Sequence, residues 1–178
     1  MGFQIEDGTG SGASAKVDGE NNLQVRAISR SQIATVSDRH GESFTWSHSY
    51  NYDAGDTVLL VSNSSTTKKL YIHFVAIGSD TSTQWVVHSP AYPTLAGTEV
   101  TGVNTNRISG AAADAEAYGD EIGNTQANIL ATGFAMGNAT AALWPEASII
   151  LGYHDTIAVD LVTAGTMGTV TIAAYYHE

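Results

Sequence analysis

Six histidines are the side chains in this sequence that are best suited to metal binding or acid–base chemistry. Their positions give no His-x-His or His-Glu-x-x-His spacing, the patterns that place two imidazoles on one face of an element, although a sheet could still gather them in space. We interpret them as strand and turn residues with local partners, and we expect no metal site. His48 is the first to examine because it shares an expected strand face with Phe44 and Trp46. The six are His40, His48, His73, His88, His154 and His177.

The sequence does not indicate a nucleophilic centre. It has no cysteine, which excludes disulfides and thiolate ligands, and it lacks the Gly-x-Ser-x-Gly turn that exposes a catalytic serine. The glycine-rich residues 8–12 lack the Lys-Ser/Thr ending of a phosphate-binding loop, so we interpret them as a flexible hinge. A carboxylate pair from distant strands would leave no signature in the sequence. We therefore expect no catalytic residues and no cofactor, and we do not expect an enzyme.

An acidic cluster and a set of aromatic residues also deserve a chemical interpretation. The acidic cluster falls in an Ala-rich stretch, residues 111–121, which we interpret as a solvated loop or short helix, with Ca²⁺ binding as the alternative. The aromatic residues could line a sugar-binding face, but strand aromatics more commonly belong to a core or a subunit interface. The acidic residues are Asp114, Glu116, Asp120 and Glu121, and the aromatic residues are Trp46, Trp85, Trp144 and Tyr175.

The charge balance excludes several classes of partner. The net charge is −11, and residues 90–178 hold Arg107 as their only basic residue against nine acidic ones. Binding to nucleic acid requires clustered Lys and Arg, and an anionic membrane surface would repel this chain. The longest apolar runs are strand-sized, well below the ~20 residues of a membrane helix. We expect neither nucleic acid nor a membrane as a partner.

Alternation of apolar and polar residues predicts an antiparallel all-β domain. In residues 43–50, large aromatic side chains alternate with Ser and Thr, and residues 57–61 are apolar throughout, which predicts a strand covered on both sides. Short polar turns join the strands, as is typical of a sandwich. The predicted fold is therefore an antiparallel β-sandwich, jelly-roll-like, with about eight strands. The other expected strands are residues 69–77, 84–88, 99–103, 127–135, 148–153, 157–162 and 169–176.

The first 34 residues differ from the rest of the chain. They are rich in turn-forming residues and poor in apolar ones, so we divide the chain into an N-terminal arm, residues 1–34, and a β-sandwich domain, residues 35–178. The apolar residues of the arm come in short alternating sets that suit strands pairing with another chain, although a disordered terminus is equally compatible. The expected partner-contact residues are Phe3, Ile5, Leu23, Val25 and Ile28.

Six segments of the chain carry a resemblance to a known family: residues 2–10, 15–18, 23–28, 97–104, 117–120 and 147–162. Together these segments resemble structural proteins of tailed-bacteriophage virions, in particular the head decoration, or cement, proteins. The likeness spans most of the chain and is carried by composition and order rather than by chemical motifs. It includes no catalytic residue.

The resemblance implies a jelly-roll-like body that assembles as a homo-oligomer, commonly a trimer. It also implies attachment to the major capsid (coat) protein at the outer surface of the virion, after synthesis in the host cytoplasm. On this interpretation the protein stabilises the capsid by bridging coat subunits. The alternatives are a tail, fibre or head-to-tail connector component, and a carbohydrate-binding adsorption module.

Overall fold

The computed structural model describes residues 31–91, 96–121, 124–145 and 148–177, together with the backbone of residues 16–17 and 23–24. Its contacts divide the chain into two units, Met1–Ser31 and Gln32–Glu178. In the first unit, β1 (Lys16–Val17) pairs with β2 (Leu23–Gln24) in antiparallel register. Leu23 therefore opens a short strand, whereas the other expected contact residues of the arm, Phe3, Ile5, Val25 and Ile28, lie outside the described residues. Their contact with a coat protein stays a prediction.

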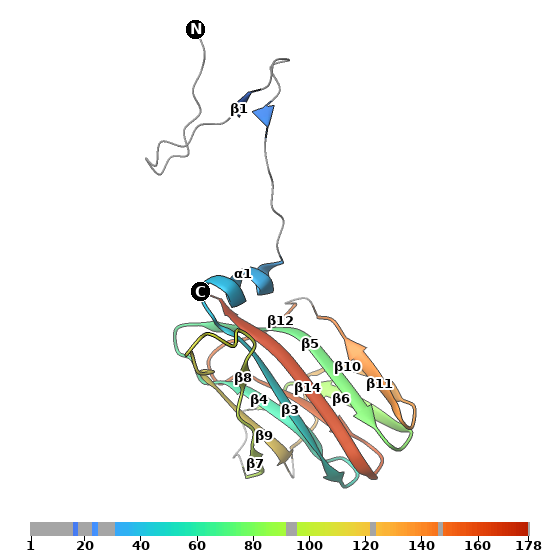
Figure 1. Ribbon diagram of the computed structural model, residues 1–178. Helices are drawn as coiled ribbons and strands as arrows, with labels where there is room; N and C mark the ends of the chain where they lie inside the picture. The colour runs from blue at the N-terminus through green and yellow to red at the C-terminus, as the bar shows by residue number, and fades with distance from the viewer. Residues whose placement is uncertain are drawn as a thin grey trace. The chain divides into compact units, whose positions relative to one another are not determined.

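The second unit is an antiparallel β-sandwich of two sheets, which confirms the predicted fold class (Figure 1). We name the sheets after their central strands. The β14 sheet contains β3 (Ser43–Tyr52), β5 (Lys69–Ser79), β8 (Val103–Asn104), β11 (Ala139–Leu143), β12 (Ile149–Leu151) and β14 (Gly165–His177). The β13 sheet contains β4 (Thr57–Asn63), β6 (Thr83–His88), β7 (Thr98–Glu99), β9 (Ala115–Glu121), β10 (Ile129–Ala135) and β13 (Thr156–Leu161).

The strand order is that of a jelly roll. In the β14 sheet, β3, β14 and β5 are followed by β11 and β12, which both pair with β5; in the β13 sheet the order is β4, β13, β6, β10. The chain therefore alternates between the sheets. The first strand of the sandwich, β3, pairs with the last, β14, and the second, β4, pairs with the last but one, β13. The connection from β6 to β10 carries β7, β8 and β9, which extend both sheets at the edge opposite β10 and β11.

The core lies between the sheets and follows the predicted alternation. Phe44 and Trp46 of β3 are buried, whereas Ser47 and Ser49 are exposed and bond through their hydroxyls to threonines of β14. All seven residues of β4 are buried, which confirms the strand covered on both sides. The main inward-facing residues that fill the core are Leu59, Val61, Ile72, Val75, Ile77, Val87, Ile157, Val159, Leu161, Val170 and Ile172.

A short helix, α1 (Gln32–Arg39), precedes the first strand of the sandwich, where the sequence pattern did not indicate one. It ends where the amides of His40 and Gly41 both bond to the carbonyl of Val36, with Gly41 at φ 63°. A residue in the left-handed region terminates helices in this way, and glycine adopts it without a side-chain penalty. Val36 is buried, and the helix packs on β14 and β3.

Two predictions for the connection between β6 and β10 were wrong. The Ala-rich stretch of residues 111–121 is not a loop or helix, because Ala115–Glu121 forms β9 and pairs with β4. The strand expected at residues 99–103 is divided into β7 and β8, which join different sheets. In addition, β11 is a strand that the pattern did not predict.

Candidate functional site

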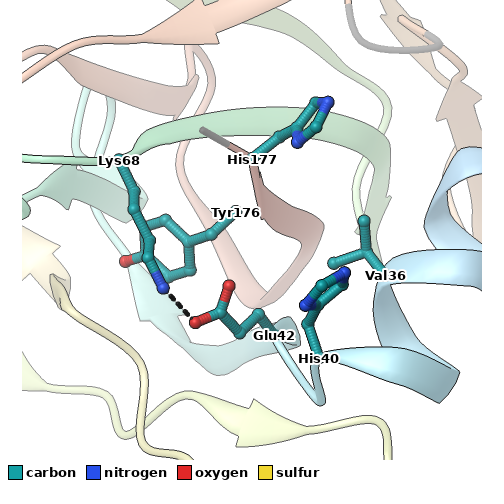
Figure 2. Close-up of a pocket in the computed structure, with 6 residues that line it drawn as sticks. All are labelled: Val36, His40, Glu42, Lys68, Tyr176 and His177. Atoms are coloured by element: carbon teal, nitrogen blue, oxygen red, sulfur yellow. Dashed lines mark hydrogen bonds and ion pairs between the residues drawn. The ribbon is translucent and has the colours of Figure 1, made fainter. Parts of the chain in front are cut away.

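A small pocket lies where α1 meets the ends of β5 and β14 (Figure 2). Its volume is about 250 Å³. His40 follows the helix, Glu42 leads into β3, Lys68 precedes β5, and His177 ends β14. Lys68 and Glu42 form an ion pair across the pocket, so its strongest cation and anion already satisfy each other. Val36 and Tyr176 complete the lining.

The chemistry available in this pocket is limited. Burial, followed by the charge of Asp114, raises the pKa of Tyr176 far above its usual value, so its phenol stays neutral and cannot act as a base near pH 7. The two imidazoles belong to exposed residues. Among the described residues there is no group of three or more His, Cys, Asp or Glu side chains that could hold a metal ion. The pocket therefore contains a salt bridge and two exposed imidazoles, and no assembled catalytic set.

The most complete polar network is buried in the β13 sheet. Asp160 of β13 is fully buried; its carboxylate accepts hydrogen bonds from Thr57 Oγ1 at 2.7 Å and Gln126 Nε2 at 2.9 Å. His88 of β6 is also fully buried, and its Nε2 lies 3.0 Å from Asp160 Oδ2, the distance of an ion pair when the imidazole is protonated. Asn124 Nδ2 donates to Thr57 Oγ1 at 3.1 Å.

This network fastens the segment after β9 onto the outer face of the β13 sheet. Asn124 and Gln126 come from that segment. The residues after β6 are held to the same sheet by a separate hydrogen bond, which Thr156 of β13 donates to the carbonyl of Pro90 at 2.7 Å. Because the carboxylate and imidazole are fully buried, the arrangement is structural and offers no access to a substrate. Sequence reasoning missed it, since its members lie on three strands and a connecting segment.

The residues singled out for metal chemistry are dispersed. His48 packs against the backbone of Gly119, close to Tyr50, rather than beside another imidazole. Glu116, Asp120 and Glu121 lie on β9 and Asp114 directly precedes it, so the acidic cluster follows a strand and is not a solvated loop. Glu121 is 1 % exposed and accepts hydrogen bonds from the amides of Ala96 and Gly97, at 2.9 Å and 2.8 Å, which accounts for its burial.

The aromatic residues considered for sugar binding are likewise not gathered on one exposed surface. Trp46, Trp85 and Tyr175 are buried, so they cannot form an exposed platform. Trp144, which follows β11, is 60 % exposed, and its ring lies 4.4 Å from that of Phe74.

The most distinctive surface is the edge of the sandwich formed by β10. Its residues expose large apolar side chains: Ile129 by 58 %, Leu130 by 44 % and Phe134 by 75 %, and Met136 just beyond the strand by 69 %. No charged residue and no histidine occurs between Glu121 and Glu146 in the sequence. We call Ile129–Met136 the apolar edge. Exposed apolar residues grouped without charge mark interaction sites more often than catalytic ones.

A second pocket, of about 290 Å³, lies beside the apolar edge. Leu130 of β10 and Ile149–Leu151 of β12 form its apolar side, and Ser89, Ser148 and Asp155 form its polar side. A register irregularity between Ile129 and Ala131 releases Leu130 from pairing with β6. This bulge explains why Leu130 belongs to the pocket and not to either face of the sheet.

Comparisons with protein-family models, with curated proteins and with solved structures found no match to this chain. Within the part of the chain that the structure describes, no helix is long and apolar enough to cross a membrane. The functional argument therefore depends on the surfaces described above.

Proposed function

We propose that this protein is a structural component of a tailed-phage virion, of the head decoration (cement) type, which binds the outer surface of the head and bridges coat subunits. The observation that carries the proposal is the apolar edge, four large apolar side chains exposed on a rigid sandwich without a charge among them. Such a surface suits a permanent contact between proteins. The resemblance of the sequence to decoration proteins supplies the identity of the partner.

The proposed mechanism requires no chemistry. A protein that binds the assembled shell and not its separated subunits stabilises the shell by mass action. On a symmetric capsid the same contact is repeated many times, so modest individual affinities combine through avidity. The arm residues Phe3, Ile5, Leu23, Val25 and Ile28 are proposed to contact the coat protein by adding a strand to one of its edges.

The test is to mix the purified protein with capsids that lack it, and to measure co-sedimentation and the capsid melting temperature. Binding with a higher melting temperature is the expected result. The absence of both would refute the proposal. A variant lacking residues 1–31 should stay folded and lose attachment if the arm is the anchor, whereas retained attachment would show that the sandwich alone binds.

Copy number per particle separates the decoration role from a tail, fibre or connector role. Hundreds of copies agree with decoration of the head, whereas a few to a dozen would place the protein at a vertex or in the tail. Quantitative mass spectrometry of purified particles, with the coat protein as the internal standard, gives this number.

Carbohydrate binding is the second candidate function, because Trp144 presents an exposed ring that packs, tilted, against Phe74. Glycan-array binding that is lost in Trp144→Ala would support it. Trp85→Ala is unsuitable for this test, because Trp85 is a core residue and its truncation would destabilise the fold.

A further inference from the structure

We propose that the apolar edge binds a second copy of this chain, with β10 of one copy pairing antiparallel to β10 of the other about a two-fold axis. Among the described residues, β10 pairs with β6 on one side and has no strand on the other. The backbone amides and carbonyls on that side are available for a further strand. In this arrangement the apolar edge joins two copies of the protein, and contact with the coat protein is made by the arm proposed above. The inference concerns the isolated protein and is tested without capsids.

The edge lacks the usual protection against such pairing. Native sheets block their edges with charged side chains, proline, very short strands or bulges. From Ala131 to Ala135 the strand has neither charge nor proline, and its bulge lies before this segment. The opposite edge of the same sheet is protected, because β7 has two residues and the exposed carboxylates Glu99 and Glu116 lie on β7 and β9.

The register between β10 and β6 determines which side chains of β10 face the core and which face outward. Gly133 lies opposite Trp85, whose ring fills the space above it, so Gly133 faces the core. Thr132 and Phe134 consequently face outward and are exposed. A two-fold axis near Gly133 brings Phe134 of the two copies close together on this outer face, where cross-strand apolar pairs stabilise sheets.

Charge permits a second copy at this edge and at few other places on the surface. The chain has a net charge of −11, so two copies repel each other over most of their surface. The apolar edge is where that repulsion is weakest, and it offers no charge to attract a basic partner. Acidic residues flank the apolar edge and limit the extent of the contact. They are Asp80, beside Gly137, and Asp155, in the neighbouring pocket.

The exposed apolar area reaches the lower limit for a stable pair. The four exposed side chains of the apolar edge offer on the order of 500 Å², more than half of the ~800 Å² that each partner buries in a standard interface. Pairing of a strand with its own copy is isologous and closes at two copies, whereas a trimer requires two different surfaces to meet.

The test compares one substitution at the two edges of the β13 sheet. Thr132→Lys places a charge on the apolar edge, and Thr98→Lys places the same charge on β7; both threonines are exposed. Native mass spectrometry and light scattering should give twice the 18.7 kDa chain mass for the original protein and for Thr98→Lys. Thr132→Lys should be monomeric, with dimerisation weakened by about 100-fold or more. Equal unfolding temperatures show that both variants are folded.

A labelling experiment tests the geometry directly, since the chain has no cysteine. In the paired arrangement the two copies of residue 132 lie within about 8 Å, so a short bis-maleimide should cross-link Thr132→Cys to itself and leave Thr98→Cys uncross-linked. A monomeric or trimeric original protein would overturn the inference, as would equal behaviour of the two edges. A monomer would leave capsid attachment intact, and failure to bind capsids would leave this dimer intact.

Discussion

Replacing Asp160 by alanine should be among the most destabilising single changes in the domain. Its carboxylate is fully buried and accepts hydrogen bonds from Thr57 and Gln126, with His88 Nε2 3.0 Å away. In Asp160→Ala the buried Thr57 hydroxyl and the exposed Gln126 amide lose their acceptor, and the buried His88 imidazole loses its neighbouring carboxylate. The loss of one member of a buried polar network is costly because water cannot enter to replace it.

The magnitude follows from the number of groups left without a partner. Each buried polar group that is left without its partner costs about 1–3 kcal/mol, so the loss for the Thr57 hydroxyl and the His88 imidazole together is about 2–6 kcal/mol. In a domain of this size each kcal/mol lowers the melting temperature by about 2–4 °C. We therefore expect Asp160→Ala to melt about 4–24 °C below the original protein. Asp160→Asn keeps an acceptor for Thr57 but turns an amide toward Gln126, so it should cost about 1–3 kcal/mol.

Calorimetry and urea unfolding measure both variants, with Asp53→Asn as the matched control. Asp53 is exposed in a turn, so its change should stay within about 0.5 kcal/mol. A double-mutant cycle of Asp160→Asn with His88→Gln gives the coupling between the two side chains. If Asp160→Ala unfolds within about 1 kcal/mol of the original protein, the network does not fasten the sheet as we infer.

Three further changes test other parts of the structure. Gly119→Ala should cost about 1–3 kcal/mol in urea unfolding, because a Cβ there would lie 2.1 Å from the His48 ring; unchanged stability would show that the ring moves aside freely. Burial, with two nearby aspartates, raises the pKa of Tyr50, so the stability linked to its neutral phenol should be present below about pH 10 and lost as the pH rises further. Because the chain has eight tyrosines, the difference in absorbance at 295 nm between the original protein and Tyr50→Phe is the signal that should rise only with unfolding. A hydrogen bond from Thr166 lowers the pKa of Asp80 below its usual 3.8. The stability that the ionised Asp80 carboxylate contributes should therefore be lost as the pH falls through the lowered value. An NMR titration in which Thr166→Val leaves the Asp80 pKa unchanged would contradict the assignment.

The sequence predicts strands well where the strand supplies its own large inward side chains. In β3, Phe44 and Trp46 alternate with serine and threonine, and the period of two is plain. In β9 the inward positions include Ala117 and Gly119, and the facing sheet supplies the bulk through His48. Alanine-rich sequence favours helix in isolation, so tertiary packing decided this element against its local propensity.

The candidate sites were harder to predict than the fold. The buried network depends on register, because His88, Asp160 and Thr57 meet only when β6, β13 and β4 are neighbours. The apolar edge was accessible in principle, since a long uncharged segment in an acidic chain is visible in the sequence. Recognising it as exposed required knowing that β10 lies at the edge of its sheet.

The nested pairing of the jelly roll constrains when the domain can form during synthesis. Ser43, at the start of β3, pairs with Tyr175 of β14, which leaves the ribosome after almost all of the domain has been translated. Both central strands, β13 and β14, also come late in the sequence, so neither sheet can be completed before these strands have been synthesised. High contact order of this kind slows folding, and during the delay the unprotected strand β10 is available to other nascent copies. The same edge that we propose joins two folded copies is therefore the first place where unfinished copies would aggregate.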